Sequence, residues 1–107
     1  MTIRRCNGMK NAFNQLTPAQ AERLAILLEE LGEMQQAIGK ILRHGYTSRN
    51  PDVLDGPTNR ESLERELGDV AAAMGLLFEA NDLDEQTVTN RVLVKALKIK
   101  PYLHHQA

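Results

Sequence analysis

The sequence predicts an all-α fold, with two long antiparallel helices and a third, C-terminal helix in a helical bundle that is completed by oligomerisation. Two long stretches carry apolar residues at helical spacing, and each begins with a capping box. No stretch shows the alternation of a strand pair. With 107 residues, 42% of them hydrophobic and 25% charged, the chain has the composition of one folded domain.

The first helix is expected over residues 18–44. Thr17 is a good N-cap, Pro18 suits the first helical position, and Gln20 completes the capping box. Gly45 is placed to end this helix. A mainly apolar line of residues, its main stripe, is expected along one face of this helix: Leu24, Leu27, Leu28, Leu31, Gln35, Ile38 and Leu42.

Residues 45–58 contain two Gly, two Pro, two Asp and one Asn, which predicts a loop. A loop of this length in a small domain is often functional. Thr58 and Glu61 then form a second capping box, which opens a helix that runs to about Ala80 before Asn81 breaks the pattern. Its main stripe comprises Leu63, Leu67, Val70, Met74, Leu77 and Phe78.

The third helix has two possible starts. Asp82 with Glu85, or Asp84 alone, could cap it. It is expected to run to about Lys100, because Pro101 cannot continue a helix.

These boundaries divide the chain into an N-terminal arm (1–16), a helical domain (17–101) and a C-terminal tail (102–107). The chain has two Phe, two Tyr and no Trp, so the core of the domain must be aliphatic and thin. A thin core is easier to stabilise when subunits share it, so we expect a homo-oligomer.

Several classes of protein are excluded by composition. The single cysteine, Cys6, excludes an intrachain disulfide and a thiolate-rich zinc site. No apolar run approaches the roughly 20 residues of a membrane span, and the N-terminus does not resemble a secretory signal. We therefore expect a cytoplasmic protein with no membrane partner.

Charge is segregated along the chain, although the formal net charge is only −1. Residues 17–85 hold all 14 acidic residues and six of the 13 basic ones, and the two ends hold the remaining seven. Seven bases divided between two ends, with few aromatics, are a weak footprint for nucleic acid, so no nucleic-acid partner is expected. An acidic centre is compatible with cations.

The first helix carries acidic residues on a face that is otherwise apolar. At about 100° per residue, Glu30 lies inside an arc of apolar side chains, and Glu29 and Glu33 lie at its edge. Residues three and four apart meet on a helix surface, so these three carboxylates are neighbours. The apolar side chains of the arc are Ile26, Met34, Ala37 and Ile41.

The second helix repeats this pattern. Glu66 and Asp69 are three residues apart and share a face with Ala73, Leu76 and Ala80. Burying unpaired carboxylates costs several kcal/mol, and a hard divalent cation such as Mg²⁺ can compensate for it. The absence of His among these acids argues against zinc and against a di-iron bundle.

A non-catalytic function is the alternative. Glutamate is common on solvated helix faces, so the chain could be a helical oligomerisation or interaction module with a solvated acidic face. Such a module would show no change in melting temperature on adding metal.

The acidic segments resemble a family signature. Glu29-Glu30-Leu31-Gly32-Glu33 has the form EExxE, and Glu66-Leu67-Gly68-Asp69 has the form ExxD. Together they resemble the MazG-like nucleoside triphosphate pyrophosphohydrolases of the all-α NTP pyrophosphatase superfamily, over roughly residues 18–100. The interval between the two motifs is longer than usual because of the loop at 45–58.

The resemblance implies an enzyme, namely a Mg²⁺-dependent hydrolase (with Mn²⁺ able to substitute) that cleaves an NTP or dNTP between the α and β phosphates. It implies a dimer or tetramer that acts in nucleotide-pool control or house-cleaning. It assigns Glu30 and Glu66 catalytic roles. The implied metal ligands are Glu29, Glu30, Glu33, Glu66 and Asp69.

Substrate contacts are expected from two places. Lys95, Lys98 and Asn90 on the third helix could reach the phosphates. Arg43 and Tyr46, beside the loop, could contact a phosphate and stack on a nucleobase.

Overall fold

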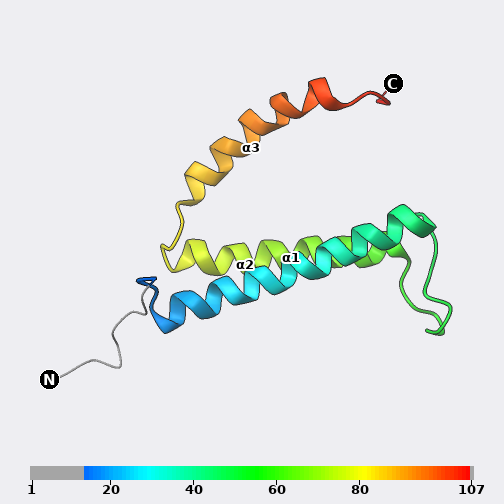
Figure 1. The fold of residues 1–107 in the computed structure, drawn as a ribbon, viewed down its shortest axis with the longest axis horizontal. Helices are drawn as coiled ribbons and strands as arrows, with labels where there is room; N and C mark the ends of the chain where they lie inside the picture. Colours follow the sequence, from blue (N-terminus) through cyan, green and yellow to red (C-terminus); the bar gives the residue numbers. More distant parts are fainter. Residues whose placement is uncertain (1–13, 107) are drawn as a thin grey trace, which may run out of the picture.

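The computed structural model describes residues 14–106, and it confirms the all-α prediction (Figure 1). The expected N-terminal arm lies almost entirely outside these residues. The elements are α1 (Pro18–His44), α2 (Asn59–Glu79), α3 (Glu85–Ile99) and a short 3₁₀ helix, η2 (Lys100–Tyr102). Within the described residues there is no strand, and no helix is both long and apolar enough to cross a bilayer.

The helix starts follow the capping residues of the sequence. Thr17 accepts a hydrogen bond from the Gln20 amide, Gln20 accepts one from the Thr17 amide, and Thr58 and Glu61 repeat this box at α2. Of the two possible caps of α3, Asp84 is the one observed: its carboxylate accepts a hydrogen bond from the Thr87 amide. At the end of α1, Gly45 adopts a φ of +90°, which is strained for residues with a side chain.

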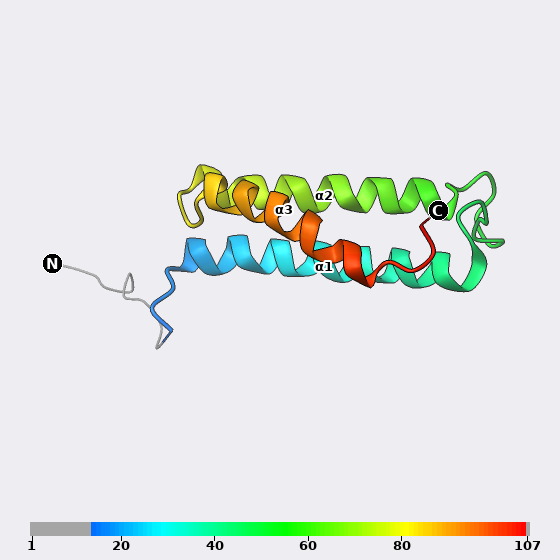
Figure 2. The ribbon, with the colours of Figure 1, turned by 90° about the horizontal axis from the view of Figure 1, so that it is seen from above.

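Helices α1 and α2 form an antiparallel hairpin (Figure 2). The buried apolar residues of the described chain lie on these two helices, and Leu77 has no exposed surface. Truncating such a leucine to alanine typically costs about 2–5 kcal/mol. The predicted thin core is therefore real: Ala37, Val70, Ala73 and Leu77 are its buried members.

The face of α1 that packs on α2 is the apolar arc that contains Glu30, where the sequence predicted buried carboxylates. The predicted main stripe is largely exposed in the single chain, with Leu28 at 72% and Leu42 at 82%. The arc around Glu30 is turned toward α2 instead, where Met34 is half-buried and Ala37 buried. The helical wheel located both apolar faces, but it could not decide which one meets α2.

Helix α3 diverges from the hairpin after the turn at residues 80–84 (Figure 1). None of its residues is buried. The Cα radius of gyration is 19.2 Å, whereas a compact chain of this length has about 13 Å. Helix α3 ends at Ile99, close to the expected end at Lys100, and Pro101 lies in the 3₁₀ turn that follows it.

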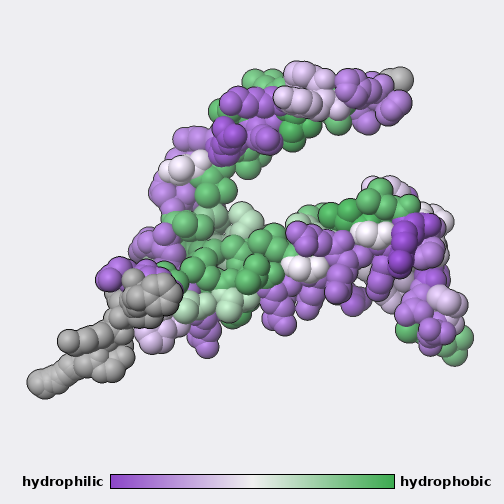
Figure 3. Space-filling view, viewed as in Figure 1, coloured by the Kyte–Doolittle hydropathy of each residue, from purple (hydrophilic) through white to green (hydrophobic). Residues whose placement is uncertain are grey.

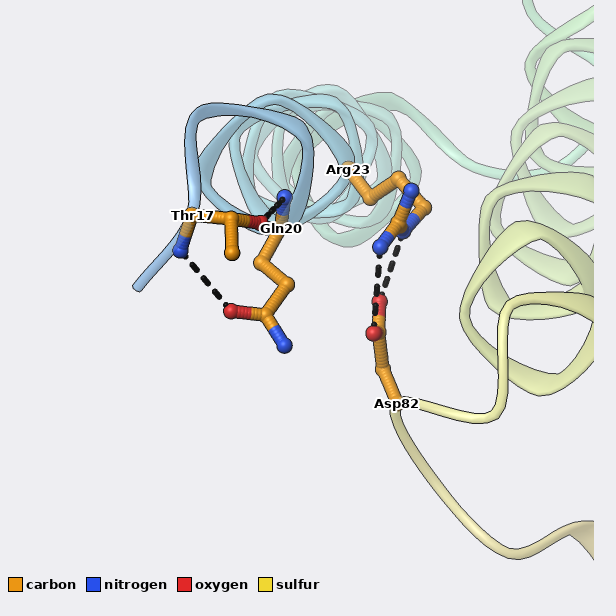
Figure 4. Close-up of polar contacts among 4 residues, drawn as sticks. All are labelled: Thr17, Gln20, Arg23 and Asp82. Atoms are coloured by element: carbon orange, nitrogen blue, oxygen red, sulfur yellow. Dashed lines mark hydrogen bonds and ion pairs between the residues drawn. The ribbon is translucent and has the colours of Figure 1, made fainter. Parts of the chain in front are cut away.

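An ion pair holds the α2–α3 turn against the first turns of α1 (Figure 4). Arg23 Nε lies 2.6 Å from Asp82 Oδ2, and its Nη2 lies 3.1 Å from Oδ1, which is a bidentate arrangement. Both side chains are largely buried, at 25% and 14% exposure. The turn is further set by Asn81, which adopts a φ of +61°.

The substitution Asp82→Asn should lower the melting temperature at neutral pH by a few degrees. The hydrogen bond with Arg23 holds the pKa of Asp82 below its ordinary value of 3.8. The folded state therefore binds this proton less readily than the unfolded state, so the contribution is present above the ordinary value and is lost as pH falls through the folded-state pKa. Thermal melts from about pH 4 downward should show a steeper loss in the wild type than in the variant. Asp52→Asn, in the exposed loop, serves as the control, and equal slopes for all three proteins would contradict the prediction.

Candidate functional site

Four carboxylates converge inside the hairpin, two from each helix. Glu30 and Glu33 come from α1, and Glu66 and Asp69 come from α2. One oxygen of each lies within 4.8 Å of one oxygen of every other. We call these four residues the acidic cluster, and it contains four of the five acids that the motifs predicted.

The two helices build this cluster with the same spacing. On α1, Glu30 is followed by an acid three residues later and by Ala37 seven residues later; on α2, Glu66 is followed in the same way by Asp69 and Ala73. Both alanines are buried. Because the helices are antiparallel, the alanines flank the cluster at opposite ends, and their small side chains allow the helices to approach closely.

Two oxygens of the cluster are buried without any hydrogen-bond partner. They are Oε2 of Glu30 and Oε2 of Glu66, one from each helix. Buried carboxylate oxygens are normally paired or bound to a cation, because burial without a partner is costly. The pair of unsatisfied oxygens therefore distinguishes this cluster from a solvated acidic face.

The electrostatics of the cluster agree with its geometry. Burial raises the pKa of Glu30 above its ordinary value, and the charges of Asp69, Glu66 and Glu29 raise it further. The charge of Glu30 is the largest cause of the raised pKa of Glu33, followed by burial. The apo cluster therefore disfavours full ionisation, and a cation between the carboxylates would reverse that preference.

The donor set fits a hard divalent cation. All four residues offer carboxylate oxygens, and Mg²⁺ and Mn²⁺ prefer oxygen ligands. Glu29 is exposed and is not part of the acidic cluster, although its charge acts on Glu30 and Glu33. The residues that could hold a metal are thus Glu30, Glu33, Glu66 and Asp69.

The expected substrate residues lie elsewhere. Lys95 and Lys98 are exposed on α3, which leaves the hairpin, so one chain does not bring them to the acidic cluster (Figure 1). Asn90 is also exposed on α3 and accepts a hydrogen bond from Gln86 at 2.9 Å. The Tyr46 ring is half-exposed and carries the Arg60 guanidinium 4.8 Å from its centroid.

A second polar site lies between the ends of the helices and the loop. Arg43, one of the predicted contacts, lines a cavity of about 720 Å³ there, together with Lys40, His44 and Arg49. Sequence reasoning did not place Lys40 at a site. The spacing of Lys40 could have indicated that it belongs to a site, since Lys40 and His44 follow Glu33 by seven and eleven residues on one helix face.

The fold and the acidic cluster define a class: an all-α protein whose paired helices present oxygen donors suited to a hard divalent cation. A family model of the MazG nucleotide pyrophosphohydrolase domain matches residues 19–104, and the chain belongs to this family. Membership confirms the resemblance read from the two motifs and indicates a hydrolase that acts on nucleotide phosphoanhydrides. No curated protein and no solved structure matched the chain.

Adding Mg²⁺ or Mn²⁺ to the metal-free protein should raise its melting temperature by several degrees. A ligand that binds only the folded state stabilises it in proportion to the logarithm of its concentration over Kd. Glu66→Gln should reduce the metal-linked rise strongly, because it removes a charge from the acidic cluster. Differential scanning fluorimetry across a metal titration measures this effect.

Glu64→Gln is the matched control, since it makes the same change at an exposed position of α2 outside the acidic cluster. It should retain the wild-type response. If Mg²⁺ and Mn²⁺ leave the melting temperature of the wild type unchanged at millimolar concentration, the cluster is not a metal site.

Proposed function

We propose that this protein is a Mg²⁺-dependent nucleotide pyrophosphohydrolase that cleaves an NTP or dNTP between the α and β phosphates, with Mn²⁺ as an alternative cation. Water would attack the α phosphorus, the bond to the β,γ-diphosphate oxygen would break, and the monophosphate and pyrophosphate would leave. The observation that carries this proposal is the pair of buried, unsatisfied carboxylate oxygens on Glu30 and Glu66 within the acidic cluster.

Different residues of the chain would bind the cation and activate the water. Glu30, Glu33 and Asp69 would hold the cation, which when bound supplies charge neutralisation to the phosphates. Glu66 would orient the attacking water and accept its proton, as a carboxylate that is not fully engaged can do. Glu30, half-buried beside Glu66, would support both roles. No covalent nucleophile is needed, since pyrophosphate leaves readily once its charge is screened.

The alternative of a helical interaction module with a solvated acidic face is less well supported. A solvated face would leave its carboxylate oxygens in contact with water, whereas an oxygen of Glu30 and one of Glu66 are buried. Membership of a hydrolase family also favours an enzyme.

We further propose that the functional form is a homo-oligomer in which a second copy covers the exposed apolar faces. The predicted stripe of α1 is exposed, and so is much of α3, where Leu97 is 67% exposed. Figure 3 shows hydrophobic surface on both sides of the space between α3 and the hairpin. A two-fold arrangement would bury the same faces of both copies. It could also bring Lys95 and Lys98 of one copy toward the acidic cluster of the other.

The proposed setting is the cytoplasm, where the enzyme would control nucleotide pools or remove aberrant nucleotides. Both roles need the same reaction and differ in which base is accepted.

Pyrophosphate release from a panel of standard and modified nucleotides should require Mg²⁺ or Mn²⁺. Glu66→Gln and Asp69→Asn should each lower kcat by about 100-fold or more, because each removes a carboxylate that acts on water or on the metal. Glu64→Gln should keep wild-type turnover. A panel without any metal-dependent turnover by the wild type would refute the proposed activity.

Leu28→Glu should convert the oligomer to a monomer or a weaker assembly, as measured by light scattering after size exclusion. The leucine is 72% exposed in one chain, so the change costs little unless a second copy covers it. Leu54→Glu makes the same change at a loop position that is 92% exposed and should leave the assembly intact. A wild type that runs as a monomer at micromolar concentration would exclude the shared bundle.

A further inference from the structure

A cationic cavity of about 720 Å³ lies at the loop end of the hairpin. Four of its lining side chains carry or can carry positive charge: Lys40, Arg43, His44 and Arg49. Of the described residues that line it, none is acidic, although the segment that forms it belongs to the acidic middle of the chain. The acids of the loop, Asp52 and Asp55, are exposed and do not line it.

The loop that forms one wall of this cavity has a defined conformation. Arg49 and Thr58 form a backbone bridge, and the Asn59 amide donates to the Ser48 carbonyl at 2.9 Å. Arg49 also donates from Nη1 to the carbonyl of the buried Gly56, which leaves its other guanidinium donors available. A Cβ at residue 56 would lie 2.9 Å from a side chain of the loop, so only glycine fits there without a shift. The cavity is therefore largely pre-formed.

Residues of the cavity and of the acidic cluster share faces of α1 and α2. On α1, Lys40 and His44 continue the face of Glu33; on α2, Ser62 precedes Glu66 by four residues on the same face and also lines the cavity. The helical rise puts these residues about 6–17 Å from the cluster toward the loop. The hairpin thus carries oxygen donors near its middle and positive charge at its loop end.

We propose that this cavity is a binding site for phosphate groups that does not need a divalent metal. Arg43 and Arg49 offer planar guanidinium donors that suit phosphate oxygens, and Lys40 adds a point charge. Two sources of such groups are compatible with its position: the β and γ phosphates of the bound nucleotide, directed toward the loop and released as pyrophosphate, or a free phosphate anion. The site itself is independent of the proposed activity, and only the assignment to the nucleotide rests on it.

Binding of inorganic pyrophosphate to the metal-free protein, measured by calorimetry in EDTA, tests the site. The wild type should bind, and the affinity should fall as salt concentration rises. Arg43→Ala should weaken binding at least tenfold. Arg65→Ala, which removes an exposed arginine of α2 outside the cavity, should bind as the wild type does. If Arg43→Ala does not fold by circular dichroism, Lys40→Gln takes its place with the same expectation.

Failure of the metal-free wild type to bind pyrophosphate would overturn the proposal. The proposal would also be overturned if Arg65→Ala weakened pyrophosphate binding as much as Arg43→Ala. Steady-state kinetics with Mg²⁺ distinguishes the two sources of the phosphate groups. A rise in KM for the nucleotide in Arg43→Ala, with kcat little changed, supports the nucleotide phosphates. An unchanged KM with lost pyrophosphate binding supports a free anion at the same site. Absence of all turnover would refute the proposed activity and leave the metal-free binding result standing.

Discussion

The need to bring four carboxylates together between two helices constrains the rest of this structure. Two negative side chains on each of α1 and α2 face the same narrow space, and two of their oxygens have no protein partner. Such a contact works against folding, so other interactions must hold the hairpin closed around it. Buried Ala37 and Ala73 at its two ends let the helices approach, and Val70 and Leu77 supply the apolar contact. The fold stabilises a site that by itself destabilises the metal-free chain.

Tethers at both ends of the hairpin serve the same purpose. At the open end, the ion pair between Arg23 and Asp82 fixes the start of α1 to the turn after α2. At the loop end, the bridge of Arg49 with Thr58 brings α2 back beside α1. With both ends fixed, the lateral register of the helices is set, and Glu33 must lie opposite the motif of α2. The apolar surface that remains outside this hairpin belongs to α3 and to the outer face of α1.

Local signals in the sequence were sufficient to predict the helices but not to predict how the helices are arranged. Thr17 and Thr58 predicted the helix starts because a capping box satisfies amides within four residues. Periodicity on both helices also located all four acids of the acidic cluster, together with Glu29, which lies outside it. The sequence alone did not fix which apolar face of α1 packs on α2, because its two apolar arcs are similar in composition and the choice between them depends on α2 and on further chains. Nor could periodicity show that α3 leaves the hairpin, since an exposed apolar face and a buried one have the same sequence pattern.

The hairpin places the acidic cluster and several basic residues of the middle segment in two distinct regions. Along the chain, the middle segment is acidic; in space Arg23 pairs with Asp82, whereas three other bases of the segment gather apart from the acidic cluster. The carboxylates of the acidic cluster lie near the middle of the hairpin, whereas Lys40, Arg43 and Arg49 gather at the loop end. A ligand that combines a bound cation with further negative charge matches both regions, since each region is then neutralised by a different part of the ligand. Opposite charges a few turns apart on the hairpin also orient such a ligand, because its reversal would set phosphate against carboxylate without a cation between them. The orientation of such a ligand therefore depends on the order of residues on α1, where Glu33 precedes Lys40 and His44 on a single helix face.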